Sequence, residues 1–345
     1  MTDTSRNRKV RGSKIRSSRS DKRQSRGSED KELKRLADAR DTDSEQAGDR
    51  VGDAFIPDEQ SFIETDAVAR VTDRMRRWLS VDRPVHLIGP TGCGKTAVAM
   101  HVARTRDRPV VWVNGDADLT TSDLVGEYAE TERISEHDQF IHNVVKRKDI
   151  VRDRWVDNPL TLAVQEGATL VYNEFSRTKP VANNVLLSVF EEGVLELPGK
   201  RGASRYVDVH PAFRTILTSN SVEYAGVHEP QDALLDRLVG LHMDFYDAET
   251  ETAIVRAHVE AADVPVAAIV GMMRELRERL EITVGTRAAI MAAEGLTAAD
   301  DPDADTVVDV CTDVLASKVS QRKPSRPLRD VIEETAGPDR GVTLS

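Results

Sequence analysis

The feature that most constrains the fold is the stretch "HLIGPTGCGKTAVAM", residues 86–100. Its centre, "GPTGCGKT", fits the pattern G-x-x-x-x-G-K-[ST] with Gly89, Gly94, Lys95 and Thr96. An apolar run precedes this motif and a helical pattern follows it, which is the strand-to-helix context that the pattern requires. Such glycines let successive backbone N–H groups point at phosphate oxygens, and the following helix adds its positive N-terminal end. The stretch therefore predicts a phosphate-binding loop.

This loop supplies candidate contacts to ATP and to a metal ion. We expect Lys95 to reach the β- and γ-phosphates and the Thr96 hydroxyl to bind Mg²⁺. The backbone of the whole loop is expected to surround the phosphates. The candidate ATP-binding residues of the loop are therefore Gly89, Pro90, Thr91, Gly92, Cys93, Gly94, Lys95 and Thr96.

A second motif lies further along the chain, in "TLVYNEFSR" at 169–177. Its apolar run ends in Asn173 and Glu174, where a nucleotide hydrolase usually carries two acids. Glu174 is the candidate for polarising the attacking water. Asn173 can accept a hydrogen bond from a magnesium-bound water through its amide oxygen, but it brings no negative charge. We therefore expect Thr96 and Asn173 at the metal, with a lower Mg²⁺ affinity than an aspartate would give.

Strand-length apolar runs alternate with helical patterns through the middle of the chain. The runs are "PVHLI" (84–88), "PVVWVN" (109–114), "TLVYNE" (169–174), "FRTILTSN" (213–220) and "LVGLHMDF" (238–245). This alternation predicts an α/β fold with a parallel sheet and crossover helices. After Tyr246 only helical patterns follow, and these predict a small α-helical lid domain.

These patterns divide the chain into four parts. Residues 1–50 are rich in Arg, Ser and Asp and hold almost no large apolar side chains, so we expect a disordered tail, basic first and acidic later. We expect the nucleotide-binding α/β domain at 51–246 and the α-helical lid domain at 247–320. Residues 321–345, first rich in Pro and Arg and then acidic, are expected to form a flexible C-terminal tail.

Composition excludes several classes of protein. Two cysteines are too few for a disulfide framework, and the most apolar run, "VPVAAIVGMM", is about half the length needed to cross a bilayer. With no apolar signal core at the N-terminus, we expect a soluble, cytoplasmic protein. The net charge of -11 fits an ordinary acidic protein or one adapted to a salt-rich cytoplasm. No aromatic residue lies among the N-terminal arginines to stack on bases, so nucleic-acid binding is less favoured.

With these two motifs, the helical C-terminal part and "ILTSN" on a further strand, the chain resembles the AAA+ ATPases and, within them, the MoxR-like branch. It is also similar to the GvpN family of gas vesicle proteins; a gas vesicle is a protein-walled, gas-filled buoyancy shell. The similarity covers roughly residues 55–255 and none of the tails. Its stretches are "TSDLVG" (121–126), "RWVDNPLT" (154–161), "NEFSRTKPVANNVLLSVFEEGVLELP" (173–198) and "SNSVEYAGVHEPQDALLDRL" (219–238).

The resemblance implies roles for three further residues. Asn220 takes the sensor 1 position and would orient the attacking water. Arg237, in "ALLDRL", resembles the arginine finger that a neighbouring subunit inserts into the nucleotide site. Arg287, in "VGTRAAI", resembles the sensor 2 arginine, which couples the nucleotide state to the domain angle. Because an arginine finger acts between subunits, the resemblance implies a homo-oligomeric ring, most often a hexamer.

The function implied by the resemblance is that of an ATP-driven remodelling factor. It would hydrolyse ATP to assist gas vesicle assembly, with other gas vesicle proteins as clients, in the cytoplasm or at the vesicles. An alternative with the same fold is a MoxR-like activator or chaperone of a metalloenzyme. A scaffold that binds ATP with little turnover also stays open, because of Asn173. A nucleic-acid-binding ATP switch is a further alternative, disfavoured because such binding weakens steeply with salt.

Overall fold

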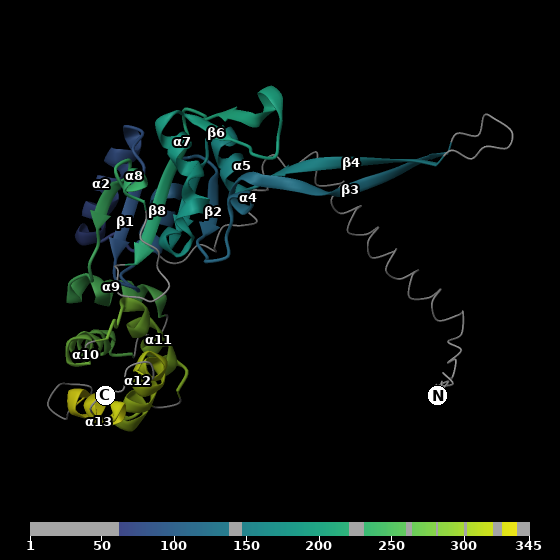
Figure 1. The fold of residues 1–345 in the computed structure, drawn as a ribbon. Coiled ribbons are helices and arrows are strands. Elements are labelled where there is room, and N and C mark those ends of the chain that lie inside the picture. Colours follow the sequence, from purple (N-terminus) through teal and green to yellow (C-terminus); the bar gives the residue numbers. More distant parts are fainter. Residues whose placement is uncertain are drawn as a thin grey trace, which may run out of the picture. The chain divides into compact units, whose positions relative to one another are not determined.

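A computed structural model shows how the chain folds (Figure 1). It describes residues 62–137, 147–220, 231–259, 264–280, 282–299, 302–319 and 326–336, and gives only the backbone of 129–137 and 147–154. All of these residues belong to one of the two units into which the chain divides, Phe55–Ser345. The tail predicted at 1–50 lies outside the described residues.

Five parallel strands form the central sheet, in the order β2-β5-β8-β1-β9. Each strand falls within or overlaps one of the apolar runs of the sequence, so the predicted α/β fold with a parallel sheet is confirmed. The runs are almost continuously apolar because parallel strands are buried on both faces. The strands are β1 (Val85–Gly89), β2 (Val110–Asn114), β5 (Thr169–Asn173), β8 (Arg214–Asn220) and β9 (Val239–His242).

Helices cover both faces of this sheet. On one face α2 (Asp66–Ser80) and α3 (Lys95–Arg104) share a core with β1. On the other face α5 (Pro159–Glu166) and α7 (Val185–Glu191) share a second core with β5. Successive side chains of a strand point to opposite faces, so both cores draw on the same strands. The result is a three-layered α/β/α arrangement.

The carboxyl ends of the parallel strands meet at one edge of the sheet. Gly89 at the end of β1 is paired with Asn220 at the end of β8, and Asn114 is paired with Asn173 in the register of β2 and β5. The sheet order therefore brings residues far apart in the sequence to one edge, which is where ligands of open parallel sheets bind.

Two hairpins that the sequence does not predict interrupt the alternation. β3 (Gly126–His137) and β4 (Arg147–Asp157) form an antiparallel pair that extends away from the sheet in Figure 1. β6 (Val194–Glu196) and β7 (Tyr206–Asp208) form a shorter one. The long hairpin was missed because its sequence is charged along its length instead of alternating apolar and polar residues. The short helices of this part of the chain are α4 (Thr121–Val125), α6 (Pro180–Asn183) and α8 (Asp232–Leu235).

The C-terminal helices share a core of their own. One of them, α13, lies inside the segment 321–345, where the sequence predicts a flexible tail. Ile332 of α13 is fully buried in that core, and Leu328 and Val331 pack against it at helical spacing. In the sequence these few apolar residues lie among charged ones, so their helical pattern is difficult to recognise. The helices are α9 (Ala248–His258), α10 (Val266–Arg279), α11 (Thr286–Thr297), α12 (Ala304–Val319) and α13 (Leu328–Ala336).

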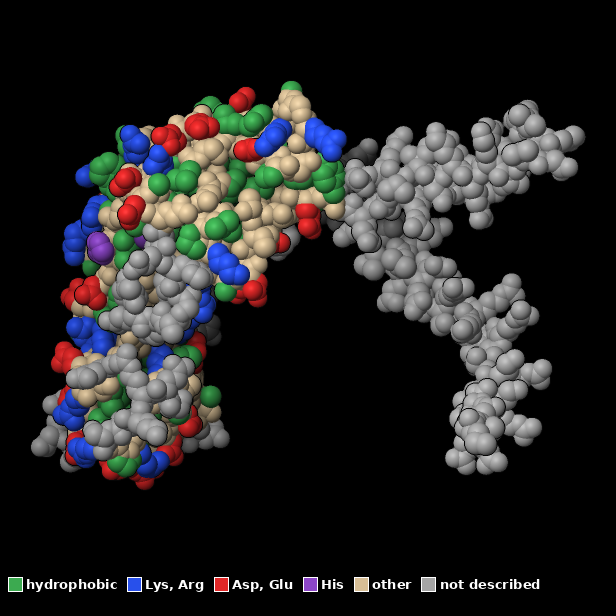
Figure 2. All heavy atoms as spheres, in the orientation of Figure 1, with side chains coloured by type: hydrophobic (Ala, Val, Ile, Leu, Met, Phe, Trp, Pro, Cys, Tyr) green, Lys and Arg blue, Asp and Glu red, His purple; other side chains and the backbone are tan. Residues whose placement is uncertain are grey.

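The surface carries mixed charges. On the face shown in Figure 2, acidic and basic side chains are interspersed among the described residues and do not gather in one basic patch of the kind that marks a nucleic-acid footprint. Within the described ranges, no helix combines the length and the apolar character needed to cross a membrane.

Candidate functional site

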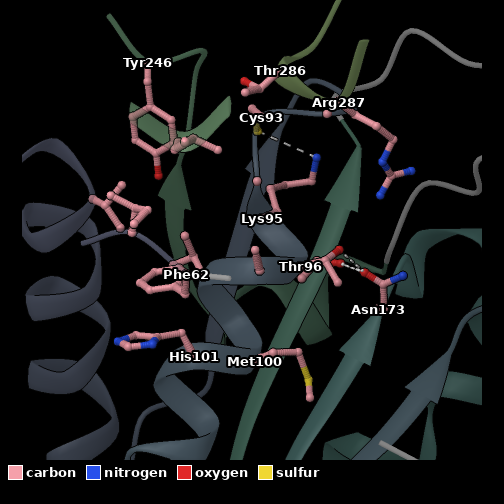
Figure 3. A pocket seen from close by; sticks show the side chains of 18 of the residues that line it. Phe62, Cys93, Lys95, Thr96, Met100, His101, Asn173, Tyr246, Thr286 and Arg287 are labelled. Atoms are coloured by element: carbon pink, nitrogen blue, oxygen red, sulfur yellow. Dashed lines mark hydrogen bonds between the residues drawn. The ribbon is translucent and has the colours of Figure 1, made fainter. Parts of the chain in front are cut away.

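A cavity of about 550 Å³ lies at the carboxyl edge of the sheet, where the phosphate-binding loop meets the start of α11 (Figure 3). Two of the predicted loop residues, Gly89 and Pro90, are not part of its lining and instead contact Lys95 through their carbonyl groups. The lining brings together most of the residues that the sequence singles out, namely Thr91, Gly92, Cys93, Gly94, Lys95, Thr96, Asn173, Glu174, Asn220 and Arg287.

Lys95, the first residue of α3, is almost completely buried and folds back on its own loop. Its Nζ donates to the carbonyl oxygens of Gly89 at 2.9 Å and Pro90 at 2.8 Å. Burial lowers the pKa of Lys95, and the nearby Cys93 and Glu174 act in the opposite direction. Desolvation disfavours the charged ammonium, so an anion placed beside Lys95 would stabilise its charged form.

Glycines shape the loop and join it to the helical part. Gly92 and Gly94 have φ angles of +84° and +90°, a region that residues with a Cβ rarely adopt. Gly285 packs so closely that a Cβ there would lie 2.7 Å from the Cα of Gly92. The backbone N–H of Thr286 donates to the carbonyl oxygen of Gly92 at 3.1 Å. The start of α11, which carries Arg287, is thereby fixed to the loop.

Asn173 lies at the end of β5, and both the oxygen and the nitrogen of its side-chain amide form hydrogen bonds. Its Oδ1 accepts hydrogen bonds from the hydroxyls of Thr96 and Thr218, each at 2.8 Å, and its Nδ2 donates to Oδ1 of Asn114 at 2.8 Å. No group of three His, Cys, Asp or Glu side chains suited to a metal ion occurs among the described residues. The adjacent hydroxyl and amide oxygens of Thr96 and Asn173 fit Mg²⁺, which keeps several waters and takes few ligands from the protein.

Glu174 follows directly in a left-handed backbone conformation, with φ of +50°. Its backbone N–H donates to the Thr218 hydroxyl at 3.0 Å, and its carboxylate pairs with Arg177 at 2.7 Å. A Cβ on Gly115 would lie 2.3 Å from the Glu174 carbonyl oxygen, so the glycine is needed for the close approach of β2 and β5 here. A non-glycine residue at positive φ costs energy and is enriched at functional sites.

A buried carboxylate behind Thr286 was not predicted. Glu251 of α9 has a side chain that is 2% exposed, and it pairs with Arg274 at 2.8 Å and with Arg277 at 2.9 Å. It also accepts a hydrogen bond from the Thr286 hydroxyl at 2.9 Å. In the sequence, Glu251 is one acidic residue on a charged helix, which predicts exposure. In the fold it holds α9, α10 and the start of α11 together.

The structure does not bring Arg237 into the cavity of its own chain. Its guanidinium pairs with Glu191 and also donates to the carbonyl oxygen of Ala233. The Nε of Arg237 is buried and has no hydrogen-bond partner among the described residues. Arg237 therefore lies outside the cavity that the other candidate residues line or border.

Comparisons with known proteins identify the family of the chain. The model of the AAA domain (dynein-related subfamily) matches residues 84–238, which include the loop, Asn173, Glu174 and Asn220. The chain is 98% identical, over 100% of both proteins, to "Gas vesicle ATPase GvpN2" of Halobacterium salinarum. It is 41% identical to "Gas vesicle ATPase GvpN" of Ancylobacter aquaticus, over 80% of this chain and 79% of that one. It is 29% identical to "Protein NorQ" of Paracoccus denitrificans, over 61% of this chain and 73% of that one.

Proposed function

The chain belongs to the GvpN family of gas vesicle ATPases, and on this premise we propose that it uses ATP hydrolysis to assist the assembly of gas vesicles. The observation that carries the proposal is the single cavity lined by Lys95, Thr96, Asn173, Glu174 and Asn220. ATP hydrolysis requires a phosphate-binding loop, oxygen ligands for a metal ion and a carboxylate, and all of these lie at the carboxyl edge of the sheet.

In this proposal the phosphates of ATP lie on the backbone of residues 89–96. Lys95 exchanges the carbonyl oxygens of Gly89 and Pro90 for oxygens of the β- and γ-phosphates. The exchange is favourable because charged phosphate oxygens are stronger acceptors than neutral carbonyls and stabilise the ammonium that burial disfavours.

In this proposal the Thr96 hydroxyl oxygen would ligate Mg²⁺ directly, and Asn173 would reach the ion through a bound water. When bound, Mg²⁺ neutralises charge shared between the β- and γ-phosphates. The Thr96 hydroxyl donates its proton to Asn173, so its oxygen lone pairs stay available. Asn173 would hold a magnesium-bound water through its amide oxygen in place of the hydrogen bond that this oxygen accepts from Thr218, and it would add no charge of its own.

Hydrolysis requires a group that activates water beside the γ-phosphate. We assign this role to Glu174, whose side chain is 29% exposed and borders the cavity. Its partner Arg177 is more than half exposed, so the ion pair is weak enough to release the carboxylate. Asn220 then orients the water, and Arg287 couples the phosphates to the helical lid.

Arg237 acts in the cavity of a neighbouring subunit in our proposal. Its place outside its own cavity and its Nε, which has no partner among the described residues, support a partner that a second copy supplies. Such a contact joins two different surfaces of the chain, and contacts of this kind close into rings. We propose a homo-oligomeric ring, with six subunits as the expected number.

The proposed motion is between the two domains that the sequence predicts. We propose that an α/β domain at 51–246 binds ATP and that an α-helical lid at 247–320 changes its angle with the nucleotide state. The clients are other gas vesicle proteins, and the work takes place in the cytoplasm or on the vesicles. A second candidate, favoured by the uncharged Asn173, is a scaffold that binds ATP with little turnover.

Gene replacement tests the proposal and separates the two candidates. Cells without their own copy receive the wild-type gene, a gene for Lys95→Ala, or a gene for Lys179→Ala as a control at an exposed lysine. We expect the wild type and the control to restore buoyant, light-scattering vesicles and Lys95→Ala to fail, because the loss of its phosphate contact abolishes ATP binding or turnover. Normal vesicles with Lys95→Ala would contradict any role for ATP.

A further inference from the structure

Tyr246 lines the cavity beside the phosphate loop, although no sequence motif includes it. It follows β9, and a Cβ added to Gly94 would lie 3.9 Å from its Cε2. In Figure 3 its hydroxyl points toward the part of the cavity that Phe62 and His101 line. The position of Tyr246 is fixed because its carbonyl oxygen accepts a hydrogen bond from Arg274 at 2.6 Å.

The hydroxyl of Tyr246 is buried and has no hydrogen-bond partner within the described part of the chain. Burial raises the pKa of Tyr246 to about 12, so at neutral pH the hydroxyl keeps its proton and can both donate and accept. Buried hydroxyls almost always have a partner, because an unpaired one loses its hydrogen bonds to water without replacement. The geometry therefore points to a partner that a ligand supplies.

A second tyrosine provides the contrast. Tyr172 of β5 is fully buried, and its hydroxyl lies 2.9 Å from Oγ1 of Thr178 and 3.0 Å from Oδ1 of Asn183. This hydroxyl has its partners inside the core and serves the fold. Tyr246 differs from it because it faces the cavity and its hydroxyl has no partner among the residues that the structure describes.

The surroundings of the hydroxyl indicate which part of a ligand it meets. Away from the loop the cavity is lined by apolar side chains together with polar ones that include His101, Arg104 and His258. One of the apolar side chains, Phe62, stacks on the ring of His101 with 3.8 Å between centroids and 10° between planes, which makes a flat wall. Apolar walls suit the faces of a flat, uncharged ring and not phosphate. The apolar lining residues include Phe62, Ile63, Val68, Met100, Ile254 and Ile290.

We propose that the Tyr246 hydroxyl forms a hydrogen bond with the edge of the nucleobase of bound ATP. This inference rests on the proposed placement of the triphosphate on residues 89–96, from which the base extends toward the apolar walls. The ring nitrogens and amino group along the edge of adenine offer both acceptors and donors, and a neutral tyrosine hydroxyl can match either. Tyr246 is thus a residue that recognises the base, while Lys95 recognises the phosphates.

The test compares Tyr246→Phe with Tyr172→Phe in the full-length protein. Calorimetry measures the affinity for ATP, for 2′-deoxy-ATP and for inorganic tripolyphosphate, and thermal unfolding measures Tm without ligand. We expect Tyr246→Phe to weaken ATP and 2′-deoxy-ATP alike, by roughly 3–10-fold, and to leave tripolyphosphate binding unchanged. Its Tm without ligand should stay the same or rise, since an unpaired hydroxyl has been removed. Tyr172→Phe should lower Tm and leave the three affinities unchanged.

Several outcomes would overturn the inference. Unchanged ATP affinity in Tyr246→Phe would show that the hydroxyl meets no part of the ligand. An equal loss for tripolyphosphate would place the effect at the phosphates, and a loss for ATP that is absent for 2′-deoxy-ATP would place it at the ribose. A failure of the proposed function is distinguishable, because wild-type protein would then not bind tripolyphosphate, or Lys95→Ala would bind it as tightly as the wild type.

Discussion

The Thr96 hydroxyl donates a hydrogen bond of 2.8 Å to the amide oxygen of Asn173 and so joins the phosphate loop to the end of β5. The same oxygen accepts from Thr218, and the amide nitrogen donates to Asn114. Asn173 therefore acts as an acceptor toward the loop and as a donor toward β2. An aspartate could reproduce the first role directly, but it could serve the second only if Asn114 changed its orientation.

The first prediction concerns Asn173→Asp. Asn114 is exposed and can turn its amide so that its NH₂ group faces the new carboxylate, which keeps the local geometry. The added charge should strengthen the hold on Mg²⁺. We expect the ATPase rate to be kept or raised and the Mg²⁺ concentration for half-maximal rate to fall. Asn184→Asp, at an exposed position, serves as the control, and a higher Mg²⁺ requirement in Asn173→Asp would contradict this account.

The second prediction concerns the neighbouring subunit. Arg237→Ala should lower kcat by at least about 100-fold and leave ATP affinity nearly unchanged, since an arginine finger acts on the transition state. Mixed with Glu174→Gln subunits, the inactive Arg237→Ala subunits should regain part of the activity, because some interfaces then combine an intact Glu174 with an intact Arg237. If the mixture stays as inactive as its components, Arg237 does not act across the interface.

The third prediction concerns the buried Glu251. Glu251→Gln leaves Arg274 and Arg277 without their shared counter-charge, and breaking a buried ion pair costs about 3–5 kcal/mol. We expect Tm to fall by about 10 °C or more in thermal unfolding. Glu294→Gln, at an exposed position on α11, is the control and should change Tm little. An unchanged Tm in Glu251→Gln would show that the carboxylate does not hold the helices together.

The fourth prediction concerns pH. His86 of β1 lies in the core, with Nε2 2.7 Å from the Ser219 hydroxyl, and burial, aided by His242, lowers its pKa from 6.5 to about 4. A lowered pKa means that the unfolded chain binds the proton first, so stability is complete above pH 6.5 and is lost as the pH falls toward 4. Between pH 7 and pH 5 the loss from this group should be about 2 kcal/mol.

Denaturant unfolding of the wild type and of His86→Gln at both pH values measures this loss. The wild type should lose about 2 kcal/mol more than His86→Gln between pH 7 and pH 5, since glutamine does not titrate. Equal losses in the two proteins would show that His86 is not kept neutral by the core.

Much of the sheet and of the cavity lining could be predicted from the sequence, for physical reasons. Strands buried on both faces must be apolar, so β1 and β5 are visible as apolar runs. The phosphate loop needs glycines at Gly92 and Gly94 because its backbone takes positive φ angles. Parallel strands end at one edge, and this places the residues after them, such as Glu174, near the loop. Their catalytic roles stay predictions.

Other features depend on contacts that leave no local pattern. Glu251 is buried only because Arg274, Arg277 and Thr286 converge on it from other segments. Tyr246 is notable because its buried hydroxyl has no hydrogen-bond partner among the described residues, and the sequence cannot show this. The helix α13 was missed because its apolar stripe is short, and becomes stable only against the other C-terminal helices.

Steady-state and single-turnover ATPase assays of Glu174→Gln test the central claim that this cavity hydrolyses ATP. The control is Glu166→Gln, at an exposed glutamate on α5. We predict that Glu174→Gln binds ATP with an affinity close to that of the wild type but retains it unhydrolysed at every Mg²⁺ concentration, because no carboxylate activates the water. If Glu174→Gln instead hydrolyses ATP at the wild-type rate, Glu174 is not the catalytic residue and this account of the site is wrong.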